Sequence, residues 1–73
     1  MKIYSHANYN RNYAKTVSLE NVRSLERDSG SGKSQIRFSV IVNYVDGKHE
    51  TFMYLEAEES IKVYKEIIDL LQQ

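Results

Sequence analysis

The sequence predicts an α+β domain: a three- or four-stranded antiparallel meander with one C-terminal helix packed on one face. Residues 36–44 and 49–55 alternate apolar with other side chains, which is the spacing of half-buried strands. Asp46-Gly47 separates the two runs and is a strong hairpin signal. Apolar residues then recur at helical spacing. The 73 residues form one predicted domain, with an irregular segment at 1–15, the sheet at 16–56 and the helix at 58–71.

The N-terminal segment, residues 1–15, interleaves tyrosines with asparagines and basic residues. Asn is a poor former of strands and helices. This segment is therefore predicted to be a loop, an irregular edge strand, or a stretch that a partner orders.

Residues 16–27 fit two patterns. Val17 and Leu19 alternate as in a strand, whereas Leu19, Val22 and Leu25 have the spacing of a helical face. We favour a strand with a bulge near Glu20-Asn21, because a third strand makes the sheet independently stable.

Residues 28–34 have the composition of a flexible loop. Gly32-Lys33-Ser34 resembles the end of a phosphate-binding loop, but Arg27 stands where that motif requires its first glycine. A strand is also predicted to follow, where the motif needs a helix. We therefore expect no nucleotide site at Lys33.

The register of the central hairpin follows from its turn. A two-residue loop at Asp46-Gly47 places Val40 opposite Met53. A slip of one residue would turn the core face outward, so the register decides which side chains are buried. In this register, Val40 and the apolar residues on the same side of the sheet form the core face, and Phe52 lies on the opposite face.

The helix is predicted over residues 58–71, with Glu58 and Glu59 in its first turn, where the helix dipole favours acids. Its packing stripe is Ile61, Tyr64, Ile67 or Ile68, and Leu71. The predicted core therefore comprises Phe38, Val40, Leu55, Ile61, Tyr64 and Ile68.

Composition excludes several classes of function. Ten basic and ten acidic residues cancel, so the chain lacks the field of a general nucleic-acid binder. It has no Cys and only two His, which excludes disulfides and argues against a metal site. We find no catalytic constellation and expect no cofactor. No apolar run reaches the roughly 20 residues of a membrane span, and the N-terminus lacks a signal-peptide pattern. A cytoplasmic protein that is not an enzyme is expected.

Ile41, Phe52 and Tyr54 are the leading candidates for partner binding. In the predicted register they cluster on the sheet face away from the core. Apolar and aromatic residues on an open face form a patch that a monomer usually hides. Either the N-terminal segment covers them, or a second molecule does. A protein partner or a homodimer is thus predicted.

A rival hypothesis is single-stranded nucleic-acid binding. Tyr9, Arg11 and Tyr13 lie in the N-terminal segment between Lys2 and Lys15. Aromatic rings can stack on unpaired bases while cations contact phosphates. The neutral overall charge favours the interpretation that these tyrosines pack on the sheet or in a protein contact.

The strand order around Val45-Asp46-Gly47, followed by an acid-led helix, resembles short uncharacterised proteins of bacteria and their phages. Glu20-Asn21-Val22 followed by Leu25-Glu26 is similar to that group as well. Some phage-encoded anti-CRISPR proteins share this β-β-β-α organisation. The resemblance covers residues 17–71; Ala57 departs from the polar cap expected there. It implies a small binding protein and carries over no functional residue.

The predicted function is therefore a small non-enzymatic protein-binding domain, in its most specific form a phage- or mobile-element-encoded inhibitor of a larger host protein. The alternatives are a single-stranded nucleic-acid binder that uses the N-terminal tyrosines, and a structural or assembly subunit that forms a homodimer.

Overall fold

A computed structural model describes residues 2–7, 14–31 and 36–73 of the chain. It contains five strands and one helix, in the order β1 (Ile3–Ala7), β2 (Ala14–Ser18), β3 (Val22–Ser31), β4 (Ile36–Tyr44), β5 (His49–Tyr54) and α1 (Ala57–Leu71). Strands β1 and β2 form a two-stranded antiparallel sheet, and β3, β4 and β5 form an antiparallel meander. The predicted α+β class, with one C-terminal helix on a sheet, is confirmed.

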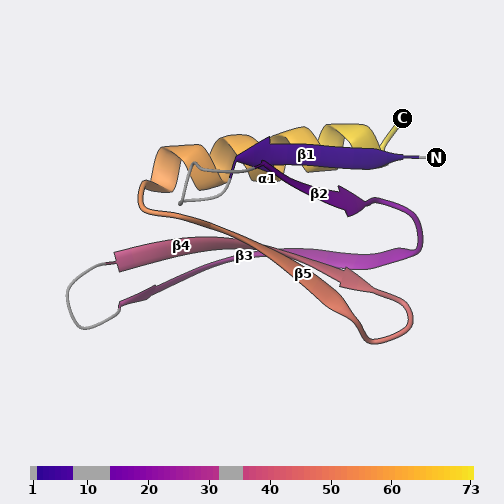
Figure 1. The fold of residues 1–73 in the computed structure, drawn as a ribbon, viewed down its shortest axis with the longest axis horizontal. Helices are drawn as coiled ribbons and strands as arrows, with labels where there is room; N and C mark the ends of the chain where they lie inside the picture. The colour runs from indigo at the N-terminus through magenta and orange to yellow at the C-terminus, as the bar shows by residue number, and fades with distance from the viewer. Residues whose placement is uncertain (1, 8–13, 32–35) are drawn as a thin grey trace.

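The β1–β2 hairpin and α1 lie on the same side of the three-stranded sheet (Figure 1). The buried apolar side chains come from all three parts: Tyr4, Val17 and Leu19 from the hairpin and its exit, Val40, Val42, Phe52 and Tyr54 from the sheet, and Val63 and Ile67 from the helix. The core is therefore the space between the sheet and a mixed layer of hairpin and helix. Each large side chain buried there contributes about 1.5–3 kcal/mol relative to exposure.

The N-terminal hairpin is more regular than the sequence predicts. Tyr4 lies opposite Val17 in an antiparallel register, and the Leu19 amide donates to the Lys2 carbonyl at 2.9 Å. Residues 3–7 and 14–18 are thus strands rather than an irregular segment. Residues 8–13 lie outside the described part of the chain.

The expected single strand over residues 16–27 is wrong, because the chain turns at the position predicted for a bulge. Strand β2 ends at Ser18 and β3 begins at Val22. Asn21 has a φ of 61°, a left-handed conformation that Asn tolerates better than most residues. The pairing of β3 with β4 then shifts in register between Val22 and Ser24. Strand β3 then runs to Ser31, into the stretch expected to be a loop.

The β4–β5 turn has a different length from the predicted one. The Gly47 amide donates to the Tyr44 carbonyl at 3.0 Å, the Tyr44 amide donates to the Lys48 carbonyl at 2.9 Å, and Gly47 has a φ of 91°. This is the pattern of a three-residue loop, a tight turn followed by a left-handed glycine. Val45 therefore belongs to the loop, and it is 63% exposed.

The extra loop residue changes the register of the hairpin. Val40 lies opposite Phe52, and Met53 lies opposite Ser39. The predicted pairing of Val40 with Met53 is wrong by one residue, which exchanges the two faces of β5. Phe52 and Tyr54 point into the core, and Leu55, predicted in the core, is 44% exposed.

The helix spans Ala57–Leu71, close to the predicted range, with Glu56 at its N-cap position. Its buried residues are Ser60, Val63 and Ile67, so only Ile67 of these was predicted. Ser60 is polar yet buried; its hydroxyl donates to the Ala57 carbonyl at 2.7 Å, which satisfies it. The predicted core is corrected accordingly: Val40 is buried, whereas Phe38, Ile61, Tyr64 and Ile68 are only partly buried. No helix in the described part of the chain combines the length and apolar character that crossing a membrane requires.

Candidate interaction surfaces

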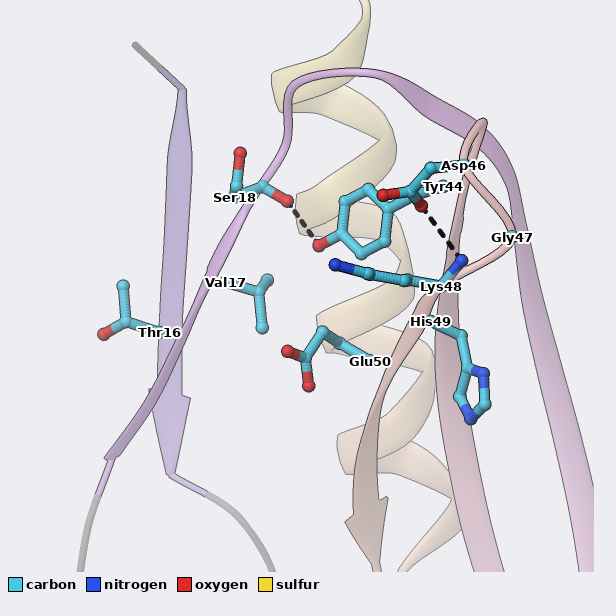
Figure 2. A pocket seen from close by; sticks show the side chains of 9 residues that line it. All are labelled: Thr16, Val17, Ser18, Tyr44, Asp46, Gly47, Lys48, His49 and Glu50. Atoms are coloured by element: carbon cyan, nitrogen blue, oxygen red, sulfur yellow. Dashed lines mark hydrogen bonds between the residues drawn. The ribbon is translucent and has the colours of Figure 1, made fainter.

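An open groove of about 550 Å³ lies between β2 and the β4–β5 turn. It is lined by Thr16, Val17, Ser18, Tyr44, Asp46, Gly47, Lys48, His49 and Glu50. Figure 2 shows the Lys48 and Glu50 side chains extending from the hairpin toward β2, whereas the Thr16 and His49 side chains point away. Thr16 and His49 therefore border the groove mainly through their backbone.

Tyr44 bridges one end of the groove. Its hydroxyl donates to the Ser18 carbonyl at 2.6 Å (Figure 2). Burial raises the pKa of the Tyr44 hydroxyl, and the negative charges of Glu50 and Asp46 raise this pKa further. The hydroxyl therefore stays protonated at neutral pH and remains a donor, which fixes β2 to the turn.

Lys15 of β2 bridges to β5 farther along the groove. Its ammonium donates to the Thr51 carbonyl at 2.8 Å and lies 3.2 Å from a carboxylate oxygen of Glu50. The same ammonium sits 5.8 Å from the centroid of the Phe52 ring, within cation–π range. The charge of Glu50 is thus balanced within the chain. Within the described residues, by contrast, the Lys48 ammonium takes part in no hydrogen bond or ion pair.

The structure places Phe52 and Tyr54, two of the predicted partner-binding residues, in the core of the chain. The Tyr4 ring meets Phe52 edge-on at 5.8 Å between centroids, and the His6 ring meets Tyr54 edge-on at 5.7 Å. The Tyr54 hydroxyl and His6 Nδ1 are 3.2 Å apart. Of the two covers considered from sequence, it is thus the chain's own N-terminal strand that lies against Phe52 and Tyr54.

Ile41, the third predicted residue, does lie on the face of β3–β5 opposite the helix, which we call the open face. Because paired residues share a face, the register places Ile41 with Thr51, and Ser39 with Met53, on this side. Leu55 follows Met53 by two positions. Sequence reasoning missed Met53 and Leu55 because the two-residue turn assigned them to the core.

Polar residues accompany these apolar ones on the open face. Asn43, two residues nearer the turn than Ile41, donates from Nδ2 to Ser24 Oγ at 3.1 Å and to Glu26 Oε1 at 2.7 Å. Glu26 is the β3 partner of Ile41. The open face therefore has an apolar part formed by Ile41 and Met53, with the exposed Leu55 directly after the end of β5. Beside it is a hydrogen-bonded polar part that extends onto β3.

The structure describes only part of the N-terminal segment that was considered for nucleic-acid binding. Tyr9, Arg11 and Tyr13 lie outside the described residues. The neighbouring Tyr4 is only 7% exposed, and its hydroxyl donates to Glu66 Oε1 at 2.7 Å. Burial and this bond to Glu66 raise the pKa of the Tyr4 hydroxyl well above its ordinary value.

The two lysines that flank this segment are also engaged within the chain. The Lys2 ammonium donates to the carbonyls of Leu70 at 2.9 Å and Gln73 at 2.6 Å, at the C-terminal end of the helix. Lys15 is held at the groove by Thr51 and Glu50. These cations stabilise the hairpin on the helix and sheet, so a phosphate would have to displace existing contacts.

Among the described residues, no cluster of three or more His, Asp or Glu side chains could hold a metal ion. Comparison with known proteins found no matching family model, no matching curated protein and no matching solved structure.

Proposed function

We propose that this chain is a small non-enzymatic protein-binding domain that uses its open face. The observation that carries the proposal is the asymmetry of the three-stranded sheet. One face is covered by α1 and the β1–β2 hairpin (Figure 1). The register places Ile41 and Met53 on the other face, and the exposed Leu55 follows directly after β5.

The composition of the open face supports binding to protein. Interfaces between proteins place apolar side chains at the centre and polar, solvent-accessible groups at the rim. Ile41 and Met53 are diagonal neighbours across β4 and β5, within reach of each other. The Asn43–Glu26 bond and Ser24 border them on the β3 side. Methionine adds a flexible side chain that can adapt to a partner surface.

The simplest partner is a second copy of the chain, related by a two-fold axis so that the open face meets itself. A domain of this size gains stability by burying more apolar surface, and it has no disulfide to use instead. A larger host protein inhibited by a phage- or mobile-element-encoded chain is the more specialised form of the same proposal.

Sedimentation velocity across the micromolar range tests the self-association. The wild type is expected to sediment as a dimer that dissociates on dilution, and Ile41→Glu is expected to sediment as a folded monomer. Gln72→Glu is the matched control, because it adds the same charge at an exposed site beyond the helix. A dimer that survives Ile41→Glu would place the interface elsewhere.

If the wild type is monomeric throughout, a photo-crosslinking residue at position 41 tests for a different protein. Position 72 again provides the control. Crosslinks to one protein species from position 41 alone would support the proposal. Equal crosslinking from both positions would contradict the assignment of this face as the binding surface.

A further inference from the structure

We infer that the groove between β2 and β5 binds an extended peptide segment that carries an acidic side chain, and that this peptide pairs with the strand edges along the groove. The groove is a separate surface from the open face. It opens between β2 and the outer edge of β5, so the inference stands or fails independently of the proposed function.

The first argument concerns backbone groups. In an antiparallel ladder, alternate residues turn their N–H and C=O toward the partner strand, and the residues between turn them outward. The Ser18 carbonyl accepts a bond from Tyr44, and the Thr51 carbonyl accepts one from Lys15, both from outside their own ladders. The outward set is therefore Thr16 and Ser18 on β2, and His49 and Thr51 on β5.

These two outward edges border the same groove without pairing with each other. Strands β2 and β5 belong to different sheets. Side chains rather than backbone bonds connect them, through Tyr44 at one end and Lys15 farther along. Thr16 and His49 line the space between with their side chains turned away (Figure 2). Unpaired strand edges are the surfaces to which proteins add an extended peptide as a further strand.

Charge selects the kind of peptide. Glu50 is already paired with Lys15 at 3.2 Å. The Lys48 ammonium enters the groove without an ion-pair partner among the described residues (Figure 2). Lys48 directly precedes β5 and Glu50 lies two positions farther on, and both side chains extend toward β2 (Figure 2). Asp46 also lines the groove, and its carboxylate accepts the Lys48 amide at 2.9 Å within the turn. A peptide strand in the groove thus meets a cation without an ion-pair partner, which an Asp or Glu side chain complements.

The inference is tested with a library of displayed, randomised eight-residue peptides, selected for binding to the full chain. Enriched peptides are expected to share an Asp or Glu and to lack proline near it, because proline cannot donate to a ladder. Lys48→Glu should weaken their binding by about tenfold, the ratio that corresponds to loss of one charge-assisted hydrogen bond. Selection against Lys48→Glu should instead enrich Lys or Arg.

A pair of proline variants tests the backbone contacts. Thr16→Pro removes an N–H that faces the groove, which an edge strand tolerates. Ser5→Pro removes an outward N–H from the opposite edge of the same hairpin, and both variants lose the Ser5–Thr16 hydroxyl contact of 2.6 Å. Thr16→Pro should abolish peptide binding, whereas Ser5→Pro should not. The amide NMR spectrum of each variant should remain that of a folded chain.

Three results would overturn the inference. The first is a selection that enriches no peptide over the display vehicle alone. The second is a set of enriched peptides that bind Lys48→Glu or Thr16→Pro as well as wild type. The third is enriched peptides whose binding is lost in Ile41→Glu alone, which would assign the peptides to the open face and support the proposed function instead.

Discussion

The two faces of the three-stranded sheet are built from the same strands yet differ sharply. On the covered face, Val40, Val42 and Phe52 are fully buried. On the open face, Ile41 and Met53 keep part of their surface exposed. Val40 and Ile41 are neighbours in sequence and similar in hydropathy, so residue type alone does not distinguish the faces.

Strand β5 shows what separates the two faces. Phe52 and Met53 are adjacent, and either one could serve as a core residue. The three-residue turn that ends at Gly47 directs Phe52 inward and Met53 outward. Tyr4 and His6 of β1 then pack on Phe52 and Tyr54, so the N-terminal hairpin covers the side chains of β5 that point inward. A single loop residue thereby decides which side chains of β5 face the helix and the N-terminal hairpin and which face away from them.

The largest expected effect contrasts adjacent residues of β5. Phe52→Ala should lower the free energy of unfolding by about 3 to 5 kcal/mol, because it leaves a cavity in a fully buried site. Met53→Ala should lower it by less than half as much, because Met53 is only partly buried. Urea denaturation of both variants, followed by circular dichroism, measures the difference. Equal losses in the two variants would contradict the face assignment.

Much of the architecture could be predicted because it depends on periodicity. Alternation over residues 36–44 and 49–55 identifies β4 and β5, and helical spacing identifies α1 to within one residue at its start. Val40 was also placed correctly in the core, and Ile67 was one of the two alternatives for its position in the packing stripe of the helix. These signals are local and repeated, so one ambiguous residue does not alter them.

The register could not be predicted because it depends on one residue, Val45. Alternation counts Val45 as a strand residue, whereas hydrogen bonds of Tyr44 to Gly47 and Lys48 place it in the loop. The buried Ser60 was missed for a different reason: a serine that bonds its own helix backbone is compatible with a core, but hydropathy scores it as polar.

The groove was missed because its two sides are far apart in sequence. Thr16–Ser18 and Tyr44–Glu50 meet only after the hairpins pack. The one signal available was the pair Lys48 and Glu50, two positions apart on one face of a strand. Nothing in the sequence indicates that Lys15 pairs with Glu50, which leaves Lys48 as the uncompensated cation.

The next effect concerns the turn that sets the two faces apart. Gly47→Val should cost about 1 to 2 kcal/mol, because Gly47 has a φ of 91° that β-branched residues avoid. A Cβ at this position would meet no atom within 4 Å, so the cost is conformational rather than steric contact with neighbours. Gly47→Asn is the control and should cost less. Thermal unfolding measures both, and equal melting temperatures for wild type and Gly47→Val would be incompatible with this turn.

The covered face also predicts how stability depends on pH. Burial raises the pKa of the hydroxyls of Tyr4, Tyr44 and Tyr54 above the ordinary value of about 10. Such groups stabilise the fold fully below the unfolded pKa, and this stabilisation is lost as pH rises through the folded values. The urea midpoint should therefore fall above about pH 10.

Tyr4→Phe separates the hydroxyl from the ring in this alkaline transition. At neutral pH it should cost about 1 kcal/mol through loss of the bond to Glu66. Its stability should then decline less steeply with pH than that of wild type, because one titrating group is gone. A decline as steep as that of wild type would show that Tyr4 does not contribute to the pH dependence.

The smallest expected effect belongs to the open face. Ile41→Thr keeps a β-branched side chain in the strand and removes apolar surface that the chain itself only partly covers. It should change the free energy of unfolding of the monomer by about 0.5 kcal/mol, measured by urea denaturation at a concentration where the protein is not self-associated. Val40→Thr, one residue away, should cost more because its hydroxyl would lie in a fully buried site. If Ile41→Thr leaves the monomer nearly unchanged but weakens self-association, Ile41 serves the interface rather than the fold. If both variants destabilise the monomer equally, the open face is covered in solution, and the contrast between the two faces disappears.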